Sequence, residues 1–147
     1  MSGKRKEEAR RWFQQARYDL KAAQWNAEGK FFNTSCFLAQ QSAEKVLKSL
    51  LYHVGARRKA LLTHSLVEMV QEAGKGLKTM QSLLEDARKL DIHYIPSRYP
   101  NGLPGGTPHQ FYSRNMAAEA IASAKKLFEA VEAYFNAQGE SEILEEP

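Results

Sequence analysis

The sequence has 147 residues, of which 43% are hydrophobic and 26% are charged, and it contains a single cysteine. These proportions are ordinary for one folded domain and argue against a chain that is disordered throughout. A single cysteine excludes an intrachain disulfide framework and a cysteine-rich zinc site. No apolar run approaches the roughly 20 residues that span a bilayer, so we expect a cytoplasmic protein that does not cross a membrane.

Positive charge is concentrated in the first part of the chain. The whole sequence carries 21 Lys+Arg and 17 Asp+Glu, a net charge of +4. Residues 1–30 and 31–62 each carry a net +4, residues 63–138 are neutral, and residues 139–147 carry −4 from four glutamates. A protein with this concentration of positive charge attracts polyanions over about a Debye length, roughly 8–10 Å. The alternative is a charged surface that only keeps the protein in solution.

The spacing of apolar residues predicts two long helices at the start of the chain. Residues 7–28 and 33–54 each place an apolar side chain at every third or fourth position, which is the period of an amphipathic helix. Gly29 and Gly55 follow the two segments, as glycine often does at a helix end. The short turn between them predicts an antiparallel pair.

Three further helices follow from local signals. Ser65 and Glu68 have the spacing of a capping box, which opens a short helix over residues 65–73. Residues 77–90 carry the next apolar stripe. Ser113 caps the last helix, whose apolar stripe runs to about residue 137.

No segment alternates apolar and polar residues with period two, so we expect an all-α fold. The architecture expected is an up-and-down four-helix bundle with an additional short helix and a long loop before the last helix. We expect the helical domain to span residues 7–138. It lies between a flexible basic N-terminus at 1–6 and a frayed acidic tail at 139–147.

The long loop, residues 91–112, holds four of the five prolines and a candidate binding site. Arg98 lies between Tyr94 and Tyr99 in the sequence. An arginine can bind a phosphate with two parallel hydrogen bonds while a tyrosine stacks on a base, so Arg98, Tyr94 and Tyr99 are candidate nucleotide-binding residues. In the alternative, the Arg98 guanidinium caps backbone carbonyls and lies between aromatic rings, and so only pins the loop.

Polar residues gather on one face of the helix expected at 33–54. Gln41, Glu44, Lys45 and Lys48 share this face by their spacing of three and four residues. We expect an exposed strip in which Glu44 pairs with Lys48. Gln41, Lys45 and Lys48 are further candidates for nucleotide binding, and the strip could line a groove between two subunits. The alternative is the solvated side of an amphipathic helix.

Arg58 and His64 form a candidate catalytic pair, with five residues between them. An imidazole can move protons while a guanidinium stabilises a pentavalent phosphate, so such a pair could cleave RNA without a metal. In the alternative, His64 bonds to neighbouring residues near a helix start and Arg58 belongs to a solvated basic corner. The four histidines never reach the i,i+4 spacing of a helical metal pair, and we expect neither a metal nor a cofactor.

Three segments form an ordered set in the sequence: RWFQQARYDL at 11–20, CFLAQQSAEK at 36–45 and YIPSRYP at 94–100, with His64-Ser65-Leu66 before the third. This set resembles the HEPN family, the higher-eukaryote and prokaryote nucleotide-binding domain. It is similar both to stand-alone prokaryotic HEPN proteins and to the C-terminal HEPN domain of sacsin. The resemblance covers residues 7–138, nearly the whole chain.

The resemblance implies a helical bundle that is usually homodimeric and that binds a nucleotide or RNA. Many prokaryotic members are encoded beside a minimal nucleotidyltransferase in toxin–antitoxin pairs, which makes such an enzyme a candidate partner. A catalytic subset cleaves RNA through an arginine followed closely by a histidine on the later helices of the bundle. The sequence after Arg98 and Arg114 offers no such histidine.

We therefore favour a non-catalytic homodimeric HEPN domain that binds a nucleotide or another phosphate-bearing ligand. The first alternative is a metal-independent endoribonuclease toxin that uses Arg58 and His64. The second alternative is a structural module for protein interaction or dimerisation.

Overall fold

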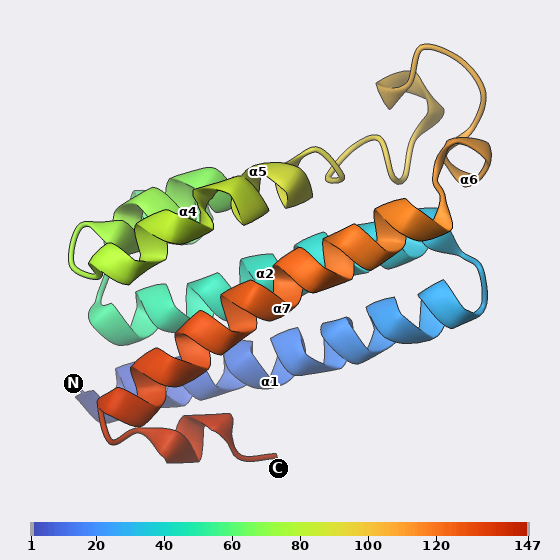
Figure 1. The fold of residues 1–147 in the computed structure, drawn as a ribbon. Helices are drawn as coiled ribbons and strands as arrows, with labels where there is room; N and C mark the ends of the chain where they lie inside the picture. Colours follow the sequence, from blue (N-terminus) through green and yellow to red (C-terminus); the bar gives the residue numbers. More distant parts are fainter. Residues whose placement is uncertain (1, 147) are drawn as a thin grey trace.

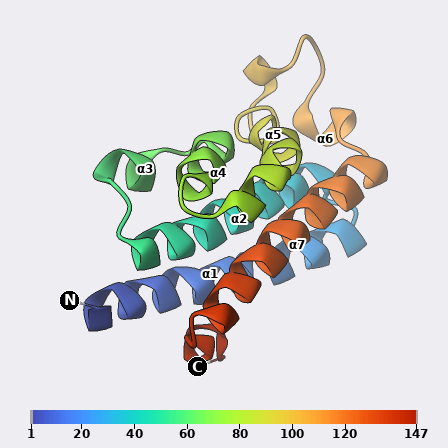
Figure 2. The ribbon, with the colours of Figure 1, turned by 60° about the vertical axis from the view of Figure 1, so that its left-hand side comes forward.

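The computed structural model describes residues 2–146, which form helices and loops (Figure 1). Two long helices, α1 (Ser2–Glu28) and α2 (Phe32–Val54), run antiparallel beside each other. The third long helix, α7 (Arg114–Ala137), packs across α2 and α1 (Figures 1 and 2). No strand occurs among the described residues, and the all-α prediction is confirmed.

Shorter helices complete the bundle on the other side of α2. They are α4 (Leu66–Gly74) and α5 (Leu84–Asp91), which pack against each other and against α2, while α5 also contacts α7. The helices α3 (Arg58–Leu62) and α6 (Pro108–Phe111) each have about one turn and lie in segments expected to be loops.

The sequence signals mark the helix ends at three places, although only half of the expected capping box forms, because the Glu68 carboxylate accepts from the Thr63 hydroxyl and not from the Ser65 N–H. The Ser65 and Ser113 side chains accept hydrogen bonds from the backbone N–H groups of Glu68 and Met116, three residues on. Gly55 ends α2 in the left-handed conformation, with φ of +71°, and its N–H bonds back to carbonyls of the last turn.

The helix expected at 77–90 is instead two helices. Residues Lys78–Leu83 form a 3₁₀ helix, η1, and α5 begins at Leu84. The stripe of Met80, Leu83 and Leu90 is nevertheless buried as expected. Spacings of three and four residues fit both kinds of helix, so the apolar pattern does not distinguish them.

Both ends of the chain are more ordered than expected. Helix α1 begins at Ser2, within the segment 1–6 that was expected to be flexible, while Met1 lies outside the described residues. The segment 139–147, expected to be a frayed tail, contains a short helix within its described part. A 3₁₀ helix, η3 (Ser141–Leu144), packs against α1 and α7, and the Ile143 side chain is fully buried.

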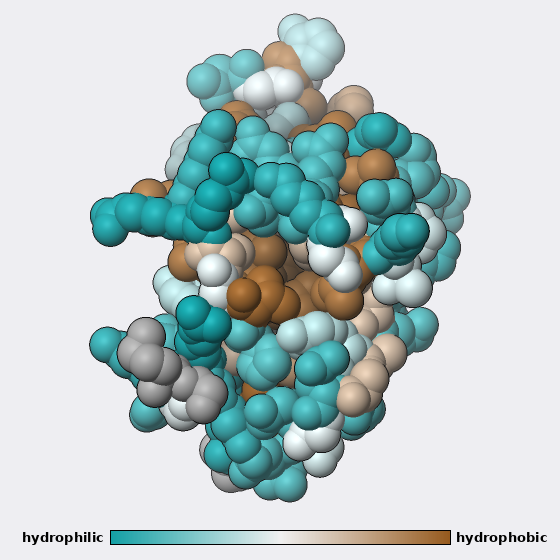
Figure 3. Space-filling model, turned by 90° about the vertical axis from the view of Figure 1, so that its left-hand side faces the viewer, coloured by the Kyte–Doolittle hydropathy of each residue, from teal (hydrophilic) through white to brown (hydrophobic). Residues whose placement is uncertain are grey.

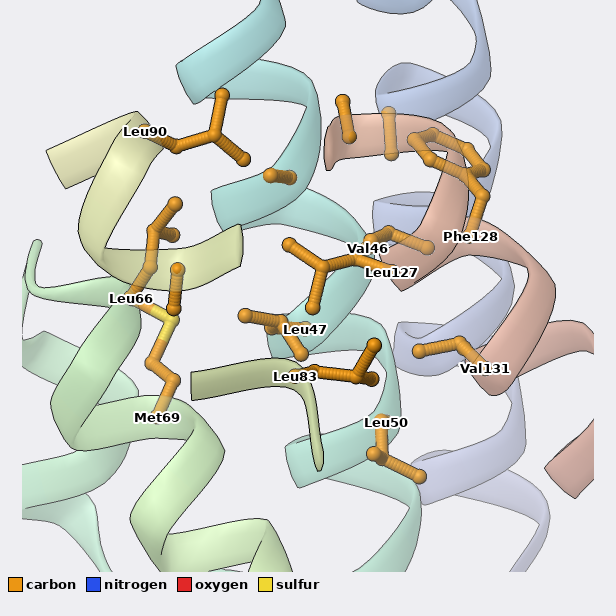
Figure 4. Packing of buried hydrophobic residues seen from close by; sticks show 14 of the residues in the cluster. Val46, Leu47, Leu50, Leu66, Met69, Leu83, Leu90, Leu127, Phe128 and Val131 are labelled. Carbon is orange, nitrogen blue, oxygen red and sulfur yellow. The ribbon is translucent and has the colours of Figure 1, made fainter. Parts of the chain in front are cut away.

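The core joins all the longer helices. Phe13 of α1 packs edge-on against Phe128 and Phe135 of α7, with ring centroids 5.8 and 6.3 Å apart. Leu47 of α2 and Met69 of α4 extend the same cluster (Figure 4). Full burial of one such side chain stabilises the fold by about 1.5–3 kcal/mol.

Apolar side chains also reach the surface at one end of the bundle. Figure 3 shows the end where α1 begins and α2 ends, with apolar side chains in a hollow that hydrophilic ones surround. Within residues 2–146, no helix combines the length and the apolar character needed to cross a membrane.

Candidate functional site

Glu44 and Lys48 form a buried ion pair on α2. The Lys48 Nζ lies 3.3 Å from a Glu44 carboxylate oxygen, and the two residues are only 4% and 6% exposed. The predicted pairing is therefore confirmed, and the expectation that these two residues lie in an exposed strip is wrong. The Lys48 ammonium also lies 5.3 Å from the centre of the Trp12 ring of α1. Removing a charged group from water is costly. The buried Lys48 ammonium therefore depends on two compensating contacts, the ion pair with Glu44 and the contact with the Trp12 ring.

His64 contacts the same carboxylate from the loop before α4. Its Nδ1 lies 3.2 Å from Oε1 of Glu44, and its ring stacks on Tyr94, with centroids 5.2 Å apart. A carboxylate only accepts hydrogen bonds, so this contact requires a proton on Nδ1, and in the neutral form of the ring Nε2 is then an acceptor. The side chain is 57% exposed, so a ligand can reach it.

Asp91, at the end of α5, holds the segment that carries His64. Its carboxylate accepts hydrogen bonds from the backbone N–H groups of Leu66 and Val67, at 2.8 and 3.1 Å, and from the Ser65 hydroxyl at 3.3 Å. A carboxylate at the start of a helix satisfies unpaired N–H groups and interacts favourably with the helix dipole. The role of Asp91 could not be predicted from the sequence, because no local pattern connects it to a helix that begins 25 residues earlier.

Arg98 is fixed by its own loop. Its Nε and Nη2 groups donate to the Tyr94 carbonyl at 2.9 and 2.7 Å. The guanidinium carbon lies 4.4 Å from the centre of the Phe37 ring, 4.8 Å from that of Tyr94 and 5.0 Å from that of Tyr99. This is the geometry of the pinning alternative, and it leaves Nη1 outside the two bonds to Tyr94.

The loop from His93 to Tyr99 is folded onto the bundle rather than open. The Asn33 side chain donates to the Ser97 carbonyl at 3.1 Å, and His93 Nδ1 lies 2.9 Å from the Tyr112 hydroxyl. Burial lowers the pKa of His93 to about 4, so this ring is neutral near pH 7. Burial likewise raises the pKa of Tyr112, which keeps the phenol protonated.

Lys45 and Gln41 also have partners within the protein. The Lys45 ammonium pairs with Asp19 of α1, and the Gln15 side chain donates to the same carboxylate at 2.9 Å. The Gln41 amide donates to the Gln40 side chain at 2.8 Å. Lys45, like Lys48, is therefore neutralised by an acid.

An open groove runs between α1 and α2 beside these residues. It has a volume of about 630 Å³, and Trp12, Tyr18, Tyr52 and Lys45 contribute to its wall. The Trp12 and Tyr52 rings are stacked, with centroids 5.8 Å apart and planes 20° apart. Flat rings in an open groove offer a surface on which a planar ligand can stack.

The predicted pair of Arg58 and His64 is not assembled. Arg58 is exposed on α3, and among residues 2–146 no hydrogen bond or ion pair joins it to His64. Its neighbour Arg57 pairs with Glu72 of α4 at 3.3 Å. Burial raises the pKa of the only cysteine, Cys36, to about 12, which makes it a poor nucleophile. No group of three or more potential metal ligands occurs in the described part of the chain.

Comparison with known proteins identifies the fold. The family model of the HEPN domain matches residues 9–134. The chain belongs to the HEPN family. A search of curated proteins gives no match.

Three solved structures resemble this HEPN chain, and each comparison covers 86% of it. TT1696 from Thermus thermophilus is 35% identical over 97% of its own chain, with a TM-score of 0.80. ST0689, an archaeal HEPN homologue, is 31% identical over 97% of its chain, with a TM-score of 0.72. A HEPN domain protein, TM0613 from Thermotoga maritima, is 27% identical over 98% of its chain, with a TM-score of 0.67.

In this HEPN domain, the three segments noted in the sequence meet along α2. Each neighbouring pair in the resulting line is joined by a stacked ring, a hydrogen bond, an ion pair or a cation–ring contact. We call this line the polar row; its members, in order, are Arg98, Tyr94, His64, Glu44, Lys48 and Trp12. Chemically, it combines one fixed guanidinium, one imidazole oriented by a carboxylate, and rings on which a planar group can stack.

Proposed function

We propose that this HEPN domain is a homodimer that binds a nucleotide or another phosphate-bearing ligand at the polar row, without catalysing a reaction. One observation carries the proposal: Arg98 forms no ion pair with an acid among the described residues, whereas Lys45 and Lys48 are paired with Asp19 and Glu44. The charge of Arg98 is therefore available to an anion, and its planar group suits a phosphate.

The neighbourhood of Arg98 supports the same proposal. Tyr99, whose ring lies beside the guanidinium, is 49% exposed and offers a face for a base. The His64 ring contacts Tyr94 from another direction and adds a polar nitrogen within the same row. A ligand with a phosphate and a base fits these two kinds of group better than a simple anion does.

Calorimetric titration with ATP, GTP and a short RNA at low salt tests the proposal. Arg98→Lys keeps a positive charge but loses the planar group, and we expect it to weaken binding by about 1–3 kcal/mol. The matched control is Lys45→Gln, which we expect to weaken binding by less because Asp19 already neutralises that lysine. If Arg98 only pins the loop, Arg98→Lys lowers the melting temperature while the affinity is unchanged, and the proposal fails.

Exposed aromatic residues on α1 support the dimer. Trp25 is 75% exposed, and Tyr18, seven residues earlier on the same helix face, is also exposed. Large exposed apolar side chains that share a face indicate an interaction surface. Light scattering after gel filtration measures the mass in solution, and we expect Trp25→Ser to raise the dimer dissociation constant. A monomer at every concentration of the parent protein would contradict the dimer.

Metal-independent RNA cleavage is the second candidate, and the contact between His64 and Glu44 favours it. Nε2 of His64 could take the proton of a ribose 2′-hydroxyl, whose oxygen then attacks the adjacent phosphorus. The bond to the 5′-oxygen breaks, the departing oxygen takes up a proton, and a 2′,3′-cyclic phosphate remains. Cleavage of tRNA in the presence of EDTA that disappears in His64→Ala would support this candidate. An inactive parent protein would leave the binding function in place.

The partner also belongs to the proposal. The partner protein in a toxin–antitoxin pair would be a small nucleotidyltransferase. We expect the two proteins to co-purify when they are expressed together. Absence of a complex, with nucleotide binding intact, would separate the binding function from this partner.

A further inference from the structure

An acidic segment at the end of the chain lies along α1. We call residues 140–146 the acidic strap; it contains η3 and runs beside α1, with contacts from Lys6 to Lys21 (Figure 1). The Glu140 carboxylate lies 3.1 Å from Lys6, and the Glu146 carboxylate lies 3.4 Å from Lys21. The buried Ile143 side chain anchors the strap between these two contacts. The strap is packed against the bundle and is not a solvated tail. It lies outside residues 9–134, the range that the HEPN family model matches.

A small cleft opens between α1 and the end of the strap. Its volume is about 240 Å³, and its lining includes Arg17, Tyr18 and Lys21 of α1 and Glu146 of the strap. Arg17 and Lys21 are one helical turn apart on the same face, so their charges converge on the cleft. Since one water takes about 30 Å³, the cleft has room for a phosphate group and several waters.

Arg17 has an unmet hydrogen-bonding requirement beside this cleft. Its Nη2 donates to the Leu144 carbonyl, and its guanidinium lies 4.9 Å from the centre of the Phe13 ring. Nη1 is buried and has no hydrogen-bond partner within residues 2–146. No acid of the described chain forms an ion pair with Arg17. A buried guanidinium N–H without an acceptor is costly. Nη1 has almost no exposed surface, so an anion in the cleft reaches it only after side chains at the cleft move.

We propose that the cleft is a phosphate-binding site, distinct from the polar row, and that the Glu146 carboxylate occupies it when no phosphate group is bound. The ligand is inorganic phosphate or the terminal phosphate of a phosphomonoester, which share the same tetrahedral anion. Its several oxygen atoms can accept from Arg17 and Lys21 together, whereas the single carboxylate contacts Lys21 only.

The contacts of the strap make this exchange feasible. The Lys21 and Glu146 side chains are both more than half exposed, and such ion pairs are weak. Ile143 is buried, so the strap stays docked while Glu146 moves away from Lys21. The strap thus sets a threshold: an anion binds only when it outcompetes the chain's own carboxylate.

Two neighbouring glutamates give a matched test. Glu146→Gln removes the competing carboxylate, whereas Glu145→Gln removes the same charge from an exposed residue that forms no ion pair with another described residue. In calorimetric titrations with inorganic phosphate at low salt, we expect about fivefold tighter binding for Glu146→Gln and less than about a twofold change for Glu145→Gln. Lys21→Gln, added to Glu146→Gln, should abolish the gain.

The remaining arms identify the ligand and the site. A titration with AMP identifies the ligand. Tighter binding of AMP than of inorganic phosphate indicates a phosphomonoester, and binding that is no tighter indicates the free ion. Equal effects of the two glutamate variants would show that only net charge matters and would overturn the proposal, as would no binding of phosphate or AMP to Glu146→Gln. Binding at the polar row gives no reason for the two variants to differ, so this comparison reports on the cleft alone.

Discussion

Nδ1 of His64 and Oε1 of Glu44 lie 3.2 Å apart, so an exposed imidazole is oriented by a carboxylate that is almost completely buried. The same carboxylate neutralises Lys48. Glu44 therefore has two roles, one in the stability of the fold and one in the orientation of a side chain that a ligand can reach.

Glu44→Gln should destabilise the protein by about 3–5 kcal/mol, because it leaves the Lys48 ammonium buried without its counter-charge. Urea denaturation measures the change. The double variant Glu44→Leu with Lys48→Met removes both charges and should recover most of the loss. A single variant within about 1 kcal/mol of the parent would show that water reaches the pair and replaces the carboxylate.

Asp91→Ala should destabilise the protein by about 1–2 kcal/mol, because the N–H groups of Leu66 and Val67 lose their acceptor. It should also shift the imidazole NMR signals of His64, whose segment Asp91 holds. Glu85→Gln is the control on the same helix, since Glu85 is exposed, and it should change the stability by less than about 0.5 kcal/mol. Unchanged His64 signals in Asp91→Ala would contradict the positioning role.

His93 should make the protein sensitive to acid. Burial lowers its pKa to about 4 in the folded state, while an unfolded histidine titrates near about 6.5. Below about pH 6.5 the unfolded chain binds a proton that the folded chain does not, so stability contributed above that pH is lost as the pH falls towards 4. The effect amounts to about 3 kcal/mol at most.

His93→Gln removes this titration and should flatten the decline in stability between about pH 6.5 and pH 4, as followed by denaturation at several pH values. Tyr112 keeps a potential partner in the glutamine, so folding is retained. Other acids also titrate in this range, so the quantity compared is the slope of stability against pH in the parent protein and in His93→Gln. Identical slopes would show that His93 is protonated at no cost in the folded protein.

Ile143→Ala should destabilise the protein by about 2–5 kcal/mol, because it leaves a cavity under the acidic strap. Thermal unfolding followed by circular dichroism measures the loss. Glu145→Ala changes an exposed residue of the same segment and should have almost no effect. Equal melting temperatures for Ile143→Ala and the parent would mean that the strap contributes nothing to the stability of the fold.

The long helices could be predicted because their signals are local. The apolar period of α2, the αL glycine at Gly55 and the Ser113 cap all act within a few residues. The i,i+4 spacing likewise predicted the pair of Glu44 and Lys48. Its burial could not be predicted, because the residues that cover it come from α1 and from the loop before α4.

The candidate site could be predicted only in part. The sequence indicated Arg98, Tyr94 and His64 one by one, but their contacts join residues that lie far apart along the chain. Asp91 and the strap were missed for the same reason. A single isoleucine among glutamates suggests a solvated tail, and only the space left between α1 and α7 makes Ile143 a core residue.

The hydrogen bonds of Asp91 couple two otherwise separate parts of the bundle. The backbone amides of Leu66 and Val67 are protected from exchange with deuterated solvent only while the end of α5 stays on the first turn of α4. Loss of that contact would release the backbone next to His64, whose ring then keeps only its contacts with Glu44 and Tyr94. We therefore expect these two amides to exchange together, as reporters of a local opening at the junction of α4 and α5.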